Sequence, residues 1–273
     1  MTQQQETTRF RFGANWLAFS SHIDAERLNE AIRSLQDAFR CQSFEGRVLL
    51  DIGCGSGLFS LAAIKLGADV VSIDFDEDSV ACAKQLREGN KIPESQWRIH
   101  QGSVLDKSLI SKLGSADLVY CWGVVHHTGN MQEAIDNVAS LVSKSGLLCL
   151  SIYNQQGGAS KRWLLIKQFY HRLPHWMRSP YVVLIAGFYE VYFALARLAK
   201  MKNPLPFSDW QQKKKDRGMS AWHDWVDWMG GLPFEVASPD DVVMQLRPQS
   251  LILEQLKTVG KGWGCNEYLF SKE

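Results

Sequence analysis

The stretch Leu50-Asp51-Ile52-Gly53-Cys54-Gly55-Ser56-Gly57 decides the fold, because it joins a short apolar run to a helical one. Residues 47–52 before it form a strand-like run, and residues 58–66 after it have helix-forming composition. Glycines permit a tight turn and let a ligand approach the backbone closely. A strand, a glycine loop and a helix in this order predict a βαβ unit that binds a ligand beyond the strand end.

On both sides of this loop, apolar strand-like runs alternate with helical segments. The alternation predicts a doubly wound α/β fold with a seven-stranded, mostly parallel sheet. Two final runs around a glycine-rich turn predict a C-terminal antiparallel hairpin. The predicted strands are residues 47–52, 69–73, 97–100, 117–122, 146–153, 251–257 and 266–270, and the predicted helices are 24–39, 58–66, 78–88 and 133–142.

The composition allows one sizeable core, since 45% of the 273 residues are hydrophobic and the net charge is +1. We divide the chain into three parts: an N-terminal helical element over 1–45 that closes over the site, a core over 46–154 and 234–273, and an insert over 155–233. The insert is helical, aromatic and basic. Between Gln155 and Arg217 it has 12 Lys or Arg residues and 3 Asp or Glu residues.

The six cysteines form no C-x-x-C pair, and several fall inside apolar runs. We therefore expect reduced thiols and neither a disulfide framework nor a bound metal. Residues 1–11 are polar and lack the apolar segment of a signal peptide. These features predict a cytoplasmic protein.

The charge beside the glycine loop distinguishes between cofactors. Gly53, Gly55 and Gly57 are spaced G-x-G-x-G. A dinucleotide fingerprint is spaced G-x-G-x-x-G, and Leu58 stands at the position of its third glycine. Asp51 would repel a pyrophosphate but attract the ammonium group of an amino acid. S-adenosylmethionine carries that ammonium and no phosphate, so the electrostatics favour it as the cofactor.

The loop resembles the first motif of class I S-adenosylmethionine-dependent methyltransferases, and the chain is similar to their quinone-methylase-like, small-molecule group. The later motifs follow in order, with an acidic strand end at Asp74, a third motif at residues 101–106 and a fourth at residues 117–127. The resemblance implies that Asp74 holds the ribose hydroxyls and that Phe75 packs on adenine. It implies cofactor contacts at Trp16, Asp51, Gly53, Cys54, Gly55, Gly57, Asp74, Phe75, Gly102, Ser103, Val104 and Trp122.

Candidates for chemistry lie where the predicted strands end and inside the insert. His126 and His127 follow the fourth strand, and histidine suits general-base work near neutral pH. His223 with Asp224 or Asp227 forms a second possible base and its orienting partner. For substrate contacts we expect Tyr153, Asn154, Trp222 and Asp224. Packing and capping are the structural alternatives for each of them.

The insert has three interpretations. Residues 181–199 are almost long enough to cross a bilayer, but Glu190 at their centre argues against it. A lid over the substrate is the leading interpretation, and peripheral membrane contact through 161–202, hence membrane association, is the alternative. We expect methyl transfer to a small-molecule acceptor that is apolar, lipid-linked or a saccharide, without nucleic acid. An RNA methyltransferase and a non-catalytic cofactor-binding scaffold stay open as alternatives, and the oligomeric state is undetermined.

Overall fold

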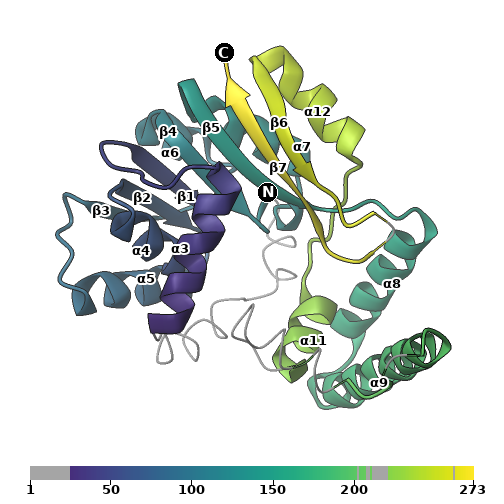
Figure 1. Cartoon of the computed structure of the whole chain (residues 1–273). Coiled ribbons are helices and arrows are strands. Elements are labelled where there is room, and N and C mark those ends of the chain that lie inside the picture. The colour runs from purple at the N-terminus through teal and green to yellow at the C-terminus, as the bar shows by residue number, and fades with distance from the viewer. Residues whose placement is uncertain (1–24, 202, 207–209, 211–220, 261) are drawn as a thin grey trace. The chain divides into compact units, whose positions relative to one another are not determined.

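A computed structural model describes residues 25–201, 203–206, 210, 221–260 and 262–273 (Figure 1). The chain divides into two compact units. The α/β unit comprises the described residues up to Gln156 together with Pro233–Glu273, and the helical unit lies within Gly157–Leu232. Trp16 and the rest of the predicted N-terminal element before residue 25 lie outside the described residues.

Within the described residues, seven strands form one sheet in the order β3-β2-β1-β4-β5-β7-β6. The first five strands run parallel, and β7 pairs antiparallel with both β5 and β6. This confirms the predicted fold class and the C-terminal hairpin. The strands are β1 (Val48–Ile52), β2 (Asp69–Asp74), β3 (Trp97–Gln101), β4 (Ala116–Trp122), β5 (Val142–Tyr153), β6 (Leu251–Lys257) and β7 (Cys265–Lys272).

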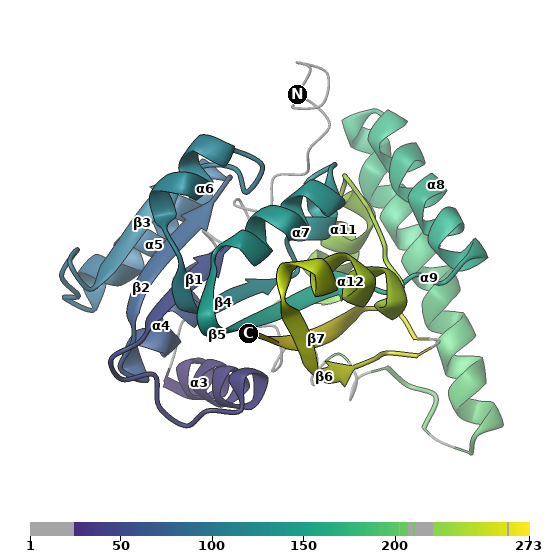
Figure 2. The same ribbon diagram turned by 90° about the horizontal axis from the view of Figure 1, so that it is seen from above.

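Helices cover both faces of this sheet, with α3 and α4 on one side and α6 and α7 on the other (Figure 2). Successive side chains of a strand point to opposite faces, so Leu49 packs toward α3 and α4 while Leu50 packs toward α7. The helices and helical turns of this unit are α3 (Ala25–Phe39), α4 (Leu58–Lys65), α5 (Glu77–Gly89), α6 (Lys107–Leu113), η1 (Val125–His127), α7 (Met131–Ser140), α12 (Pro239–Leu246) and η2 (Arg247–Gln249).

The helical unit contains α8 (Gly158–Arg172), α9 (His175–Ala199) and α11 (Ala221–Gly230). Aromatic stacking holds α8 and α9 together, because the rings of Trp163 and Tyr189 lie 5.0 Å apart at 22°. The ring of Trp228 on α11 packs edge-on against Trp163 at 5.4 Å. The helices of the insert therefore share an aromatic core.

The boundaries of two elements differ from the sequence prediction. The helix predicted over 133–142 ends at Ser140, and Val142 already pairs with Ala116 as the first residue of β5. Sequence periodicity also missed α6 and α12, although α12 begins with a full capping box between Ser238 and Asp241.

The sheet order places the ligand crevice. The chain moves outward from β1 to β3 and then returns to the other side of β1 with β4. In such sheets, ligands bind beyond the carboxyl ends of the strands where the order reverses, here between β1 and β4. The glycine loop after β1 and the segment after β4 both lie at this point.

Candidate functional site

The glycine loop after β1 has a backbone that other residues do not readily adopt. Gly53, Gly55 and Gly57 have φ values of 76°, 54° and 82°, all in the left-handed region. A Cβ atom on Gly53 would lie 2.3 Å from a methyl carbon of Val124, the residue that leads from β4 into η1. The loop therefore touches the segment after β4 directly, and only glycine fits at that contact.

The amides of this loop are already engaged inside the protein. Gly53 and Cys54 donate to the carbonyl of Ile73 at 2.8 and 3.1 Å, and Gly55 donates to a carboxylate oxygen of Asp74 at 2.9 Å. Gly57 donates back to the carbonyl of Cys54 at 2.9 Å. A phosphate-binding loop offers its amides to the anion, so this loop fits a cofactor without phosphate.

Asp51 lies behind the loop in a buried chain of hydrogen bonds. The hydroxyl of Ser60 on α4 donates to the Asp51 carboxylate at 2.5 Å, and Ser60 is hydrogen-bonded to Ser72 at 2.7 Å. The indole of Trp97 donates to Ser72 at 2.7 Å. Burial, and to a lesser extent the charge of Asp74, raise the pKa of Asp51 to about 7, although the Ser60 hydrogen bond opposes the shift. The sequence identified Asp51 but not these three supporting residues.

Negative charge gathers around the loop. Burial raises the pKa of the Cys54 thiol well above its usual value, and the nearby charges of Asp51 and Asp74 add to that rise. An anion would be repelled at this point, whereas a sulfonium and an ammonium group would be attracted. The electrostatics match the cofactor that the sequence predicts.

Asp74 is the last residue of β2, and local hydrogen bonds fix its carboxylate. One oxygen accepts from the Gly55 amide at 2.9 Å and the other from the Asp76 amide at 2.8 Å. Each carboxylate oxygen has a second lone pair, so the group suits two neighbouring ribose hydroxyls. Phe75 follows it with 40% of its surface exposed, and its contact with adenine stays a prediction.

The third motif follows β3 at the same edge of the sheet. The Gly102 amide donates to the carbonyl of Asp74 at 2.9 Å, which brings this turn beside the acidic strand end. A Cβ atom on Gly102 would lie 2.4 Å from the tip of the Leu109 side chain, so a larger residue here would require Leu109 to move. The Ser103 hydroxyl accepts from Leu105 at 3.1 Å and can still donate its hydrogen. Val104 is buried below it.

The two histidines of η1 are buried side by side, with ring centroids 4.5 Å apart. Nδ1 of His127 lies 2.7 Å from the carbonyl oxygen of Pro233. Because a carbonyl only accepts, Nδ1 carries the hydrogen and Nε2 is the basic nitrogen of a neutral ring. His126 has the opposite arrangement, since its Nδ1 accepts from the Tyr153 amide at 3.3 Å.

Aromatic rings line the neighbourhood of these histidines. Tyr153, the last residue of β5, stacks on His126 with the ring centroids 3.8 Å apart. Phe234 packs on Tyr153 at 5.4 Å. Asn154, also predicted to contact substrate, donates to the carbonyl of Gly260 at 2.7 Å and accepts from the buried Asn266 at 3.0 Å. Both ends of its amide thus hold the C-terminal hairpin.

Glu235 positions the histidine segment, and sequence reasoning missed it. Its carboxylate accepts from the amides of Gly129 and Met131 at 3.0 and 3.2 Å, while its own amide donates to the carbonyl of His126 at 3.0 Å. Burial raises the pKa of Glu235, and the two amide hydrogen bonds oppose the shift. Glu235 lies more than 100 residues from these partners, so no local pattern could reveal it.

The remaining predicted site residues belong to β4 of the α/β unit and to α11 of the helical unit. The indole of Trp122, at the end of β4, donates to Glu267 on β7 at 3.1 Å, on the side of β4 away from β1. Trp222 is 42% exposed at the start of α11. His223 and Asp224 belong to α11, but their side chains lie outside what the structure describes. Their roles stay predictions. Among the described residues, no group of three or more His, Cys, Asp or Glu is placed to hold a metal ion.

The residues at this edge fit S-adenosylmethionine. The loop excludes side chains at Gly53 and Gly57, four of its amides bond within the protein, and β2 ends in a fixed carboxylate. These features provide a close backbone surface for the amino-acid part and an acceptor for the ribose. The site therefore has the donor and acceptor set that a sulfonium nucleoside requires.

Comparison with known proteins agrees with this geometry. Residues 50–148 match the methyltransferase domain family. The chain is 27% identical over 164 residues to the ubiquinone biosynthesis O-methyltransferase of Glaesserella parasuis serovar 5 (strain SH0165), covering 60% of this chain and 68% of that protein. It is 30% identical over 115 residues to the protein of that name from Bordetella avium (strain 197N), covering 41% of this chain and 45% of that protein.

The fold is shared with solved structures. The crystal structure of magnesium protoporphyrin IX methyltransferase from Synechocystis PCC 6803 with bound S-adenosylhomocysteine superimposes with a TM-score of 0.52. The alignment covers 90% of this chain and 82% of that chain at 15% sequence identity. At this identity the likeness concerns the fold alone.

Proposed function

We propose that this chain, which carries a class I S-adenosylmethionine-dependent methyltransferase domain, methylates a hydroxyl oxygen of a small, apolar acceptor. The single observation that carries the proposal is the opposite arrangement of the two histidines. It makes Nε2 the basic nitrogen of the His127 ring, on the segment that follows β4. A base is needed only where the acceptor must lose a proton, which favours a hydroxyl over a tertiary amine or a thioether.

The cofactor is held by residues of the α/β unit. We assign the amino-acid part to the loop at Gly53–Gly57, the ribose to Asp74, and adenine to the turn at Gly102–Val104. When bound, S-adenosylmethionine supplies a methyl group on a positively charged sulfur, an electrophile for an oxygen nucleophile. The negative charge of Asp74, together with that of the partly ionised Asp51, favours that positive cofactor in this crevice.

His127 takes the hydroxyl proton of the acceptor on Nε2. The Pro233 carbonyl then stabilises the resulting imidazolium, because it already accepts a hydrogen bond from Nδ1. His126 keeps Nδ1 engaged with the Tyr153 amide, and it serves to position His127 and Tyr153. Its own Nδ1 does not accept a proton without losing that bond.

The acceptor is apolar because the groups around the histidines are aromatic. The ring of Tyr153 lies next to His126, and the ring of Phe234 packs on Tyr153. The relatives named above are O-methyltransferases of ubiquinone biosynthesis, which supports a hydroxylated, quinone-like ring as the acceptor. A saccharide acceptor would instead call for a wall of hydrogen-bonding side chains.

A methyl-transfer assay with His127→Gln tests this proposal. The wild-type chain, given methyl-labelled S-adenosylmethionine and a panel of hydroxylated benzoquinols, simple sugars and RNA, should label the benzoquinols. His127→Gln should lower kcat about 100-fold or more, because a positioned base contributes about that much. Cofactor affinity, measured by calorimetry with S-adenosylhomocysteine, should stay unchanged.

His126→Gln is the matched control, since it replaces the neighbouring ring with the same side chain. It should raise the KM for acceptor more than it lowers kcat, because His126 positions and does not take the proton. Equal losses of kcat in both variants would contradict the assignment of the base. Labelling of the sugars or of RNA, with the benzoquinols unlabelled, would contradict the acceptor class.

A further inference from the structure

The longest helix among the described residues, α9, exposes its apolar face and packs its charged face inside the helical unit. Its most apolar 18-residue window has a mean hydropathy of 1.7, yet only 6% of that window is buried. By length and composition alone, α9 could cross a membrane, and it is the one helix of the described part for which this holds. An exposed apolar surface of this size marks an interaction site.

Six of the exposed apolar residues form one continuous stripe along α9. They recur at intervals of three, four and seven residues, which places them on a single helix face. Each of the large side chains in this stripe has between 38% and 68% of its surface exposed. The stripe consists of Met177, Leu184, Phe188, Val191, Leu195 and Leu198.

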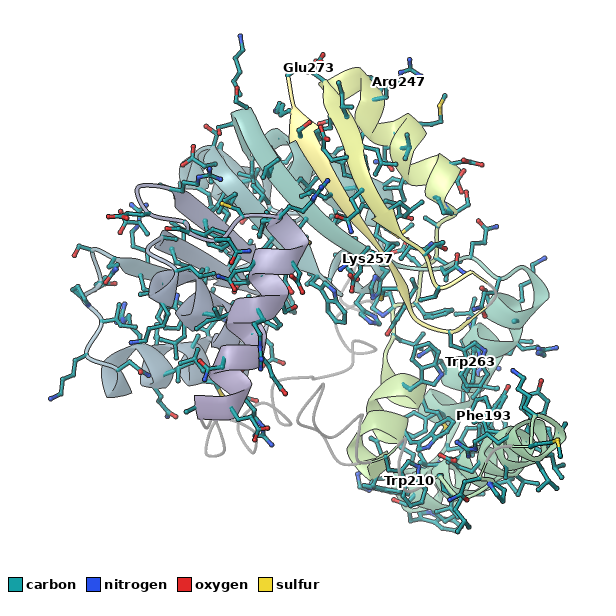
Figure 3. The ribbon with its side chains drawn as sticks, viewed as in Figure 1. Phe193, Trp210, Arg247, Lys257, Trp263 and Glu273 are labelled. Carbon is teal, nitrogen blue, oxygen red and sulfur yellow. The ribbon has the colours of Figure 1, made fainter. Side chains whose placement is uncertain are left out.

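The opposite face of α9 packs inside the helical unit and contains its charges. Tyr189 stacks between Trp163 and Trp225, with ring centroids 5.0 and 6.2 Å away. Glu190 and Arg197 lie on this side, mostly buried, with 4.0 Å between Glu190 Oε2 and Arg197 Nη2. Figure 3 shows Phe193, like Trp210, among the side chains of this unit, where the Trp210 indole donates to Glu190 at 3.0 Å.

A spanning helix does not fit this arrangement. Among the described residues, the charged face of α9 contacts α8, α11 and Trp210, and α8 exposes Lys161, Arg162 and Arg172. Carrying those groups into hydrocarbon would be costly. A helix with one protein-covered face and one apolar face instead suits a position parallel to a bilayer surface.

The charge of this unit selects the partner. Between Gly157 and Leu205 the sequence has eight Lys or Arg residues and one acidic residue, Glu190. On α8, the exposed Lys161, Leu165, Phe169 and Arg172 recur at helical spacing, and Phe169 contacts Tyr181 on α9 at 5.3 Å. Basic residues therefore border the apolar stripe, as an anionic lipid headgroup layer requires.

We propose that the outer face of α9, with the exposed face of α8, docks on the surface of an anionic lipid bilayer. The stripe inserts among the upper parts of the acyl chains, and Trp176, which is 75% exposed at the start of α9, lies at the headgroup level. Lys161, Arg162, Arg172 and Lys200 contact lipid phosphates. This contact goes beyond the proposed reaction and does not depend on the identity of the acceptor.

Vesicle flotation of the full chain tests the docking surface. Wild type should float with vesicles of mixed phosphatidylcholine and phosphatidylglycerol and much less with phosphatidylcholine alone. Phe188→Glu and Leu184→Glu should each need about tenfold more lipid for half binding, because a charge replaces an inserted apolar group. Met244→Glu is the control, since Met244 on α12 is exposed to 66%, matching 67% for Phe188 and 68% for Leu184.

Each further outcome decides for or against the proposal. Unchanged S-adenosylhomocysteine affinity and circular dichroism in the variants would attribute a loss of flotation to the surface. Equal flotation of Phe188→Glu and Met244→Glu, or equal flotation with both lipid mixtures, would overturn the proposal. A dimer that Phe188→Glu splits, without flotation of wild type, would assign the stripe to a second copy of the chain.

Tryptophan quenching gives an independent readout in which the residues of the stripe stay unmutated. Vesicles with brominated acyl chains should quench part of the wild-type fluorescence, and Trp176→Phe should remove that part. Absence of quenching with floating protein would show that the apolar stripe stays outside the bilayer, and would overturn the insertion.

Discussion

The α/β unit and the helical unit distribute polar and apolar side chains in opposite ways. In the α/β unit, buried leucines, valines and isoleucines fill both sides of the sheet, and the functional polar groups gather at the carboxyl edge of the strands. In the helical unit, Lys167 is fully buried while Leu184 and Phe188 are exposed. The first unit therefore has the arrangement that we expect of a ligand-binding domain. The second exposes an apolar surface to water, as we expect of a docking surface.

The clearest contrast is between Asp74 and Lys167, two charged residues with different surroundings. Asp74 is partly exposed at a strand end, where its oxygens accept from the amides of Gly55 and Asp76. Lys167 donates to the Trp228 carbonyl and lies 4.8 Å from the centre of the Trp228 ring. We expect the first charge to serve a ligand, whereas the second holds α8 and α11 together. Substitutions should separate these two roles.

Asp74→Asn should have the largest effect on ligand binding. It removes the charge and one acceptor from the predicted ribose clamp, and hydrogen bonds to charged groups contribute about 1.5–3 kcal/mol each. Affinity for S-adenosylhomocysteine should therefore fall about 100-fold, with little loss of thermal stability. Asp76→Asn is the control, because Asp76 caps α5 and asparagine caps equally well. Unchanged affinity in Asp74→Asn would place the ribose elsewhere.

Lys167→Met should have the complementary effect. The change keeps the length of the side chain but removes a buried donor to a backbone carbonyl, at a cost of about 2 kcal/mol in unfolding free energy. Lys161→Met on the exposed side of the same helix should change it by about 0.5 kcal/mol or less. Chemical denaturation measures both. If Lys167→Met left stability unchanged, the contrast between the two units would lose its main support.

Asp51 should give the smallest effect, as a pH dependence. Its folded pKa of about 7 lies above the unfolded value of 3.8, so the folded state keeps a proton that the unfolded state has lost. Stability from this group therefore falls as pH rises through that window, by about 1 kcal/mol between about pH 6 and about pH 7. Asp51→Asn should remove that slope in melting curves across this range. An identical slope in the variant would assign the pH dependence to another group.

The fold could be predicted from the sequence because its signals are local. Parallel strands buried on both faces are short apolar runs, and residues 47–52 and 117–122 show them plainly. The glycine loop was recognisable because left-handed backbone demands glycine at Gly53, Gly55 and Gly57. Periodicity overran the end of α7, because Leu141 and Val142 are as apolar in a strand as they would be in a helix.

The sequence by itself determined the order of the functional motifs along the chain: a glycine turn, then an acidic strand end, then a pair of histidines. Only the tertiary structure decided which nitrogen of His127 is basic, because the Pro233 carbonyl that fixes it lies 106 residues away. It also decided that α9 turns Leu184 and Phe188 outward and Glu190 inward. Helical composition is the same for either orientation, and only packing against α8 and α11 chooses between them.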